Sequence, residues 1–348
     1  MIRSGILILV LSVILFLSLA PSCKKEVNSN TQEKSDSWEV LTNSPLKEIV
    51  PIDINIIFFD VDTGISQGMS AVRKTTDGGK TWDLLHNFEK TSVSSLVFTK
   101  NNVFWSVGST FNDEKYKPVI LNSDDRGVTW QQIIFDKKDS EKIDKKFTGF
   151  SDICFDPTGK SWIIGSGGIV ESLIKGQKFE VTNIFLTKEE LYSVSCSDEG
   201  DVWAVGNEGA IYHFQNDWKK KERNKDYTFE KVKLIGYDVW LLGYKRSTDD
   251  KGISGILLKS TDRGNSWEDK TPANAPGLND LHLKNGIGWL IGDNGSVYYS
   301  DNNGDSWEKQ KSLTKNNLSN IYYLDTENIW IGGANQTILR YKANSAAQ

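Results

Sequence analysis

Residues 288–307 read GWLIGDNGSVYYSDNNGDSW, and this stretch holds the two short patterns that decide the fold. The first is a W-x-x-G step from Trp289 to Gly292. The second is a turn that begins with Ser or Thr, has Asp or Asn two residues later and Gly four residues later, and ends in Trp307. The first pattern recurs at Trp105, Trp162, Trp203, Trp240, Trp289 and Trp330. The second recurs at Trp82, Trp130, Trp267 and Trp307, with a partial copy at Trp38.

Copies of the W-x-x-G step lie 37 to 57 residues apart, and self-similarity at this period with Gly and aromatic punctuation is typical of a propeller. Each copy also has an inner segment that begins with a polar residue and then alternates apolar positions, as a strand with two unlike faces does. Seven such segments are present: 53–56, 95–98, 152–155, 193–196, 231–234, 280–283 and 320–323. The sequence therefore predicts an all-β protein, a seven-bladed β-propeller.

Several copies are degenerate. In the first copy Gly64 takes the place of the second-strand Trp, the third copy loses its turn around Ile174 to Phe179, and the fourth shortens it around Asn216 to Trp218. The seventh copy stops near Lys342 without an outer strand, whereas residues 37–40 read as an outer strand without a blade. We expect this N-terminal strand to pair into the last blade and so to close the ring.

The N-terminus differs from the rest of the chain. Residues 6–19 form an apolar run too short to span a bilayer, so we predict a lipoprotein signal peptide over residues 1–22. Cys23 follows small residues and resembles the lipidated cysteine of the bacterial lipoprotein box. A flexible tether over 23–36, the propeller over 37–342 and a C-terminal tail over 343–348 complete the expected domains. The protein is thus expected to be exported and lipid-anchored to a bacterial membrane, the outer membrane in our prediction, facing the periplasm or the cell surface.

Four copies of the turn are well kept, and every residue type in them has a folding role: the carboxylate accepts backbone N–H bonds, Gly permits a left-handed backbone, and Trp fills the gap between sheets. We assign structural roles to Asp77, Gly79, Trp82, Asp125, Gly127, Trp130, Asp262, Gly264, Trp267, Asn302, Gly304 and Trp307. These turns are identified as Asp-box or BNR repeats. With the W-x-x-G steps and seven copies, the chain resembles the photosystem II stability and assembly factor-like propellers. The resemblance implies an assembly or stability role, but Lys heavily outnumbers Arg here, whereas the photosynthetic members are expected to have an arginine-rich patch.

Enzymatic alternatives find limited support. A sialidase resemblance would imply an arginine triad and an F-R-I-P motif. No such motif occurs, and of the six arginines after residue 22, Arg126 and Arg263 lie inside the box turns, so we expect no arginine triad in the channel. Asp53, Asp152 and Asp280 share the start of the inner segment and are candidates for carboxylates at a channel mouth, where a glycosidase could use them. Ser and Asn at the same position in other copies favour mere solvation of that mouth. The three His residues lack metal-ligand spacing, so we expect no metal and no cofactor.

Two cysteines lie beyond Cys23, on inner segments of adjacent copies. Cys154 and Cys196 have positions of opposite parity, so their side chains point either toward or away from one another. The sequence therefore leaves open whether they form a disulfide, and we expect two buried free thiols.

Long connections, such as 110–117 and 245–252, are expected to project from one face of the ring and to bind a partner. The formal charge of -5 offers no basic excess for nucleic acid. We expect a non-catalytic scaffold that binds a protein and meets the membrane through its lipid. The alternative is a carbohydrate-binding or glycoside-hydrolysing Asp-box propeller that uses the channel-mouth carboxylates.

Overall fold

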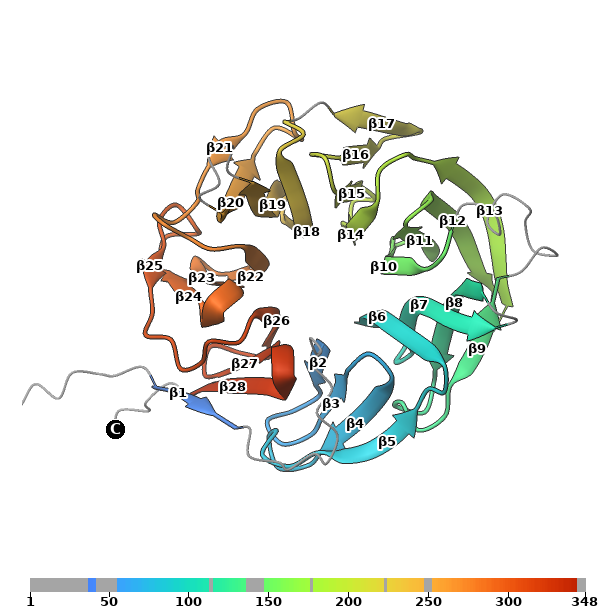
Figure 1. Ribbon diagram of the computed structural model, residues 1–348, viewed down its shortest axis with the longest axis horizontal. Coiled ribbons are helices and arrows are strands. Elements are labelled where there is room, and N and C mark those ends of the chain that lie inside the picture. The colour runs from blue at the N-terminus through green and yellow to red at the C-terminus, as the bar shows by residue number, and fades with distance from the viewer. Residues whose placement is uncertain are drawn as a thin grey trace, which may run out of the picture. The chain divides into compact units, whose positions relative to one another are not determined.

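The computed structural model describes residues 37–41, 55–112, 115–135, 147–175, 178–221, 224–246 and 252–342. These residues form seven antiparallel sheets of four strands each. The sheets stand in a ring with their first strands at the centre (Figure 1). The prediction of a seven-bladed β-propeller is confirmed.

Blades 1 to 6 each use four consecutive strands, from the inner edge outward. Blades 1 to 3 are built from β2 (Asn55–Phe58), β3 (Gly64–Gln67), β4 (Ala71–Thr75), β5 (Asp83–Asn87), β6 (Thr91–Phe98), β7 (Phe104–Asn112), β8 (Lys115–Ser123), β9 (Gln131–Ile134), β10 (Phe150–Phe155), β11 (Lys160–Gly165), β12 (Gly168–Lys175) and β13 (Lys178–Leu186). Blades 4 to 6 are built from β14 (Leu191–Cys196), β15 (Val202–Gly206), β16 (Ile211–Phe214), β17 (Trp218–Lys221), β18 (Tyr227–Ile235), β19 (Asp238–Arg246), β20 (Ile253–Ser260), β21 (Glu268–Asp269), β22 (Leu278–Lys284), β23 (Ile287–Gly292), β24 (Val297–Ser300) and β25 (Glu308–Lys309).

Blade 7 joins the two ends of the ring. It consists of β26 (Leu318–Tyr323), β27 (Asn328–Gly333), β28 (Thr337–Lys342) and, as its outer strand, β1 (Ser37–Val40). Trp38 pairs with Tyr341 across this edge, and its indole meets Trp289 of blade 6 at 5.0 Å. The predicted closure by an N-terminal strand is therefore observed. Two 3-10 turns, η1 (Asp293–Gly295) and η2 (Ala334–Gln336), connect strands on one face.

The Asp-box turns lie between the third and fourth strands of a blade, and the box of blade 2 illustrates their hydrogen bonds. The Ser123 hydroxyl donates to Asp125 Oδ1 at 2.8 Å and accepts from the Gly127 amide at 2.8 Å. Asp125 accepts from the Thr129 amide at 2.9 Å, and Trp130 Nε1 donates to the Gly127 carbonyl at 2.9 Å. Each polar group thus satisfies a turn amide or hydroxyl within its own box, as these residue types do in tight turns.

The two tryptophan series meet across the blade junctions. The indole of a W-x-x-G step packs against the box glycine of the following blade: a Cβ on Gly264 would lie 2.6 Å from Trp203, and one on Gly304 would lie 2.7 Å from Trp240. At the last junction Trp330 Nε1 donates to the Gly78 carbonyl at 3.0 Å. One motif therefore completes the packing of the other, and only glycine leaves room for the ring.

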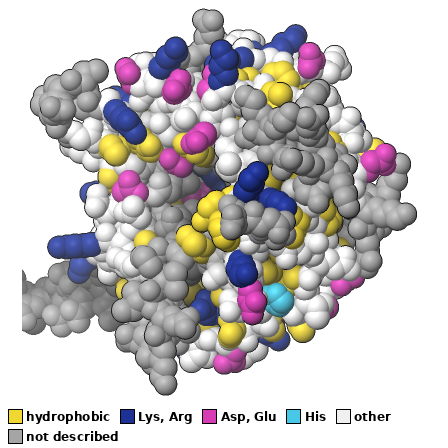
Figure 2. Space-filling model, turned by 45° about the vertical axis from the view of Figure 1, so that its right-hand side comes forward, with side chains coloured by type: hydrophobic (Ala, Val, Ile, Leu, Met, Phe, Trp, Pro, Cys, Tyr) yellow, Lys and Arg dark blue, Asp and Glu magenta, His cyan; other side chains and the backbone are white. Residues whose placement is uncertain are grey.

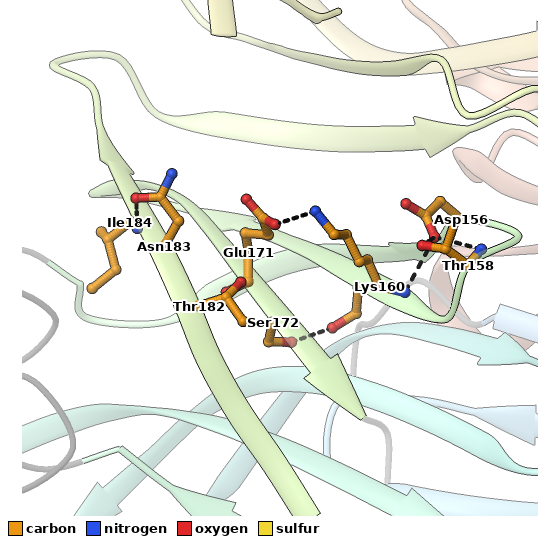
Figure 3. A network of polar contacts seen from close by, with 9 residues as sticks. Asp156, Thr158, Lys160, Glu171, Ser172, Thr182, Asn183 and Ile184 are labelled. Carbon is orange, nitrogen blue, oxygen red and sulfur yellow. Dashed lines mark hydrogen bonds and ion pairs between the residues drawn. The ribbon is translucent and has the colours of Figure 1, made fainter. Parts of the chain in front are cut away.

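Blade 3, whose box has decayed, relies on polar contacts within its own sheet (Figure 3). Asp156 accepts from the amides of Thr158 and Lys160 in the turn between β10 and β11. Lys160 Nζ pairs with Glu171 at 2.6 Å and lies 5.8 Å from the Trp162 ring. These contacts hold the blade's own strands but do not reach the preceding blade as a box does.

Blade 1 differs from the sequence alignment by one to two residues. Ile65 pairs with Ile57 of the inner strand, and in blade 2 Trp105 pairs with the equivalent inner-strand residue, Val97. Ile65, and not Gly64, therefore occupies the tryptophan position in blade 1. The polar residue that begins the inner strand of blade 1 is Asn55, and the amide of the next residue, Ile56, donates to Asn320 Oδ1 of blade 7. Without a tryptophan to anchor it, this copy could not be aligned correctly from sequence.

Candidate functional site at the central channel

A cavity of about 930 Å³ follows inner strands of the ring, and of the carboxylates predicted for the channel mouth its lining includes Asp152 but not Asp280. Its upper end, where inner strands begin, includes Asn55, Ser95, Asp152, Lys231 and Asn320. Its lower end lies among the turns after the inner strands of blades 2 to 4, on the face that carries the boxes. In every inner strand from β6 onward the pairing slips just before the polar position. At Asp152, Asp280 and Asn320 the polar side chain then accepts a backbone amide of the next blade.

Asp152 lies in the junction between blades 3 and 4. It is only 7 % exposed. One carboxylate oxygen accepts from the amide of Ile153, and the other accepts from the amide of Val194 at 3.1 Å and from the Ser193 hydroxyl at 3.2 Å. Its acceptor capacity is largely used by the two strands it joins.

Asp280 makes the same junction between blades 6 and 7. It is 1 % exposed, bonds the amides of Leu281 and Ile321, and pairs with Lys233 Nζ at 2.9 Å. Burial disfavours its charge, but the cations of Lys233 and Lys231 outweigh that effect, so the pKa of Asp280 lies below its usual range. Asp280 is thus an ionised and fully engaged carboxylate.

Lys231 and Lys233 are the basic counterparts on β18, in the inner segment 231–234, and their charge was not part of the predicted site. Burial opposes the charge of Lys231, yet Asp152 and Asp280 together raise its pKa. The same cluster affects His282: burial first, then the charge of Lys233, lowers its pKa to about 4. The inner strands β10, β18 and β22 therefore carry a neutral histidine and a charge-balanced group of two carboxylates and two ammonium groups.

Asn320 repeats the junction at the closure of the ring. Its Oδ1 accepts from the amide of Ile56 at 3.0 Å. Asn55 in turn donates to the Ser94 carbonyl of blade 2 at 3.4 Å. Asp53, the third candidate, lies outside the described residues, and Asn55 occupies the position assigned to it.

The box carboxylates lie on the lower face, away from the channel mouth. In Asp77 burial opposes ionisation, but hydrogen bonds from Thr81 and Thr75 prevail and lower its pKa to about 2. Hydrogen bonds from Ser266 likewise lower the pKa of Asp262 to about 2. Asn302 makes equivalent bonds to Ser300 and Ser306 as a neutral amide, so the turn also forms where no carboxylate is present.

Cys154 and Cys196 form a disulfide between the inner strands of blades 3 and 4. Their Cα atoms are 5.7 Å apart, and both residues line the cavity. The expectation of two free thiols is wrong, because the opposite parity of the two positions directs the sulfurs toward one another across the junction.

Within the described ranges no group of three or more His, Cys, Asp or Glu side chains is arranged to hold a metal ion. The same part of the chain contains no helix of the length and apolar character that a membrane span requires. Lys, Arg, Asp and Glu side chains alternate over the surface seen in Figure 2, with hydrophobic side chains between them.

Comparisons with known proteins agree with this architecture. A family model described as Photosynthesis system II assembly factor YCF48 matches residues 268–342. YCF48 from Cyanidioschyzon merolae is 19% identical, with a TM-score of 0.63 over 88% of this chain and 98% of that chain. A structure described as YCF48 bound to D1 peptide is also 19% identical, with a TM-score of 0.66 over 89% and 97%. The GH74 enzyme of Niastella koreensis is 13% identical, with a TM-score of 0.66 over 85% of this chain and 53% of that enzyme.

No curated protein matches the chain. The resemblance to the photosystem II assembly-factor-like propellers is confirmed by the family model and by the two YCF48 structures. At these identities the solved structures establish the fold.

Proposed function

We propose that this protein is a lipid-anchored, non-catalytic β-propeller that binds a protein partner in an assembly or stability role. The matched family model and the similar propeller described as bound to a D1 peptide support a polypeptide ligand. The partner is proposed as a protein without a photosynthetic identity, because the arginine-rich patch expected for that role is not evident in the sequence.

The observation that carries this proposal is the long hairpin of β7 and β8 in blade 2. Nine residue pairs run from Phe104 and Ser123 to Asn112 and Lys115, so the hairpin extends well past the four pairs between β15 and β16. Near its end Phe111 and Tyr116 face one another with ring centroids 5.3 Å apart, and they are 44% and 62% exposed. Exposed aromatic side chains held on a rigid support are typical anchors of protein interfaces.

The carbohydrate alternative depends on channel-mouth carboxylates that are free to meet a sugar. Asp152 and Asp280 are instead buried and bonded to amides of the adjacent blades. A carboxylate that acts as acid, base or nucleophile must reach its substrate, so this arrangement favours binding over glycoside hydrolysis.

We further propose export and anchoring through lipidated Cys23, in the bacterial outer membrane, facing the periplasm or the cell surface. Residues 1–36 lie outside the described part of the chain, so this proposal stays with the sequence. The disulfide supports it, since disulfides persist in oxidising compartments.

Affinity capture of the tagged full chain from its own cells tests the scaffold role. We expect one stoichiometric protein that is lost with Tyr116→Ser and retained with Tyr237→Ser, a matched tyrosine that is 71% exposed on the opposite face. Elution by sugars, with no protein partner, would favour the alternative. Radiolabelled palmitate incorporation that disappears in Cys23→Ser tests the anchor, and a soluble unlabelled wild-type protein would refute it.

A further inference from the structure

The second-strand tryptophans have a repeated neighbour. In blades 3, 4, 5 and 7 a cationic or imidazole side chain of the same blade lies over the indole. The pairs are Lys160 over Trp162 at 5.8 Å, His213 on Trp203 at 3.9 Å, Lys259 over Trp240 at 5.1 Å and Arg340 over Trp330 at 4.9 Å. The indole face thus recurrently receives a basic group, as expected from its electrostatics.

Blades 2 and 6 differ from the others. In blade 6 the residue opposite Trp289 is Tyr299, whose ring lies 5.0 Å away. The residue opposite Trp105 on the third strand is Asn122, which has no charge to offer. Among the described side chains none places a cation over Trp105, and the ring nearest to it is Phe155 of blade 3, at 5.6 Å.

Trp105 also lacks a box glycine of the next blade against its ring, although it is only 5% exposed and shares a core cluster with Phe150 and Ile153 of blade 3. Trp203 and Trp240 pack against a box glycine of the following blade, but blade 3 has no kept box. Trp105 accordingly lines the lower part of the channel cavity, together with Asn122.

Asn122 gives a second, independent indication of a ligand. Its side chain is only 7% exposed, and its Nδ2 has no hydrogen-bond partner although it is buried. Buried polar groups are nearly always satisfied, so an orphaned amide at a cavity wall points to a group that completes it.

The charge around this end of the cavity is negative. Asp124, Asp156 and Asp198 all line it, and the cation among them, Lys100, is paired with Asp198 at 3.1 Å. Neither Asp124 nor Asp156 forms an ion pair with another described residue, and both add negative charge to a cleft walled by aromatic side chains, which attracts a positive group.

We propose that the cavity beside Trp105 binds the basic side chain of an arginine or lysine residue from a polypeptide. The cation takes the place over Trp105 that Lys259 fills over Trp240, with Asp124 and Asp156 balancing its charge. The carbonyl of the same residue accepts from Asn122 Nδ2. This site lies at the box end of β7 and β8, whereas the exposed rings of Phe111 and Tyr116 lie at the other end of the same hairpin.

The test uses the folded full chain with tryptophan indoles labelled with ¹⁵N. N-acetyl-arginine amide is titrated, and the Trp105 Nε1–H signal is assigned from Trp105→Phe. We expect saturable movement of this signal, whereas N-acetyl-citrulline amide, the uncharged isostere, binds at least about tenfold more weakly.

Two variants locate the site. Asn122→Lys supplies the missing cation, as Lys259 does in blade 5, and should abolish binding. Asp124→Asn should weaken binding about threefold to tenfold, since an attractive charge is lost. Asp301→Asn is the matched control, because Asp301 follows the first box serine of blade 6 as Asp124 does in blade 2.

Equal affinity for the citrulline compound would overturn the proposal. So would unaltered binding to a folded Asn122→Lys protein, or equal losses in Asp124→Asn and Asp301→Asn.

Discussion

Removing the disulfide between blades 3 and 4 should destabilise the ring substantially. The bond joins residues 42 apart in sequence. In the chain-entropy treatment, releasing a loop of this length restores about 13 cal/mol/K to the unfolded state, or about 4 kcal/mol at 25 °C. This value is an upper limit, because residual structure in the unfolded chain lowers it.

The location of the bond gives it particular weight. The boxes of blades 3 and 4 are decayed and shortened, so the junctions that precede them lack the glycine contact that covers Trp203 and Trp240 elsewhere. At the junction of blades 3 and 4, Trp162 instead meets Trp218 at 5.4 Å. We infer that the covalent bond compensates there for the lost box.

Urea unfolding of the Cys154→Ala/Cys196→Ala double variant, followed by circular dichroism, measures the effect. We expect a loss of about 2 to 4 kcal/mol in the free energy of unfolding, and a similar loss when the wild type is reduced. The reductant should leave the double variant unchanged, which controls for its other effects. A loss below about 1 kcal/mol in the free energy of unfolding, or free thiols found at Cys154 and Cys196 of the native protein by mass spectrometry, would refute the reasoning.

Other predictions concern the boxes. The pKa of Asp262 is about 2 in the folded protein, below its ordinary value of 3.8, so its contribution to stability is present above pH 4 and is lost as the pH falls toward 2. Asp262→Asn should therefore flatten the pH dependence of the free energy of unfolding between about pH 4 and pH 2. The box of blade 6 contributes nothing to this dependence through its Asn302, which is a neutral amide. An acid profile of the variant equal to that of the wild type would contradict this. Gly264→Ala should cost about 2 kcal/mol or more in urea unfolding, because its φ is +75° and its Cβ would lie 2.6 Å from Trp203. Gly252→Ala, at φ +91° with open space around it, is the control and should cost about 1 kcal/mol. Equal costs would show that the contact between blades is unimportant.

The blade number and the closure could be predicted because they follow from local patterns. Alternation, turn residues and the unmatched strand at 37–40 are visible in the sequence itself. A propeller repeats one sheet, so recognising one copy locates the others wherever a tryptophan anchors the alignment. The first copy lacks that anchor, so the sequence alignment assigned the first position of its inner strand to Asp53 where the structure has Asn55.

Contacts between blades were much harder to predict. Asp152 and Asp280 have the same sequence context whether they solvate a channel or bond the next blade. The structure distinguishes these cases through a slip in strand pairing that has no sequence marker. The disulfide and the Lys233–Asp280 pair likewise depend on how adjacent sheets face one another. The difference between Asn122 and Lys259 was present in the sequence, but its meaning required the pairing with Trp105 and Trp240.

We propose that the inner-strand carboxylates Asp152 and Asp280 hold adjacent blades together and do not act in catalysis. The free energy of unfolding of Asp280→Asn tests it most directly. Breaking a buried ion pair costs about 3 to 5 kcal/mol in general, and the partial exposure of Lys233, 31%, reduces the expectation to about 2 kcal/mol. Residues kept for function commonly cost stability, so their removal is neutral or stabilising. A loss of about 2 kcal/mol is the predicted result, and an Asp280→Asn protein as stable as the wild type or more stable would contradict the account.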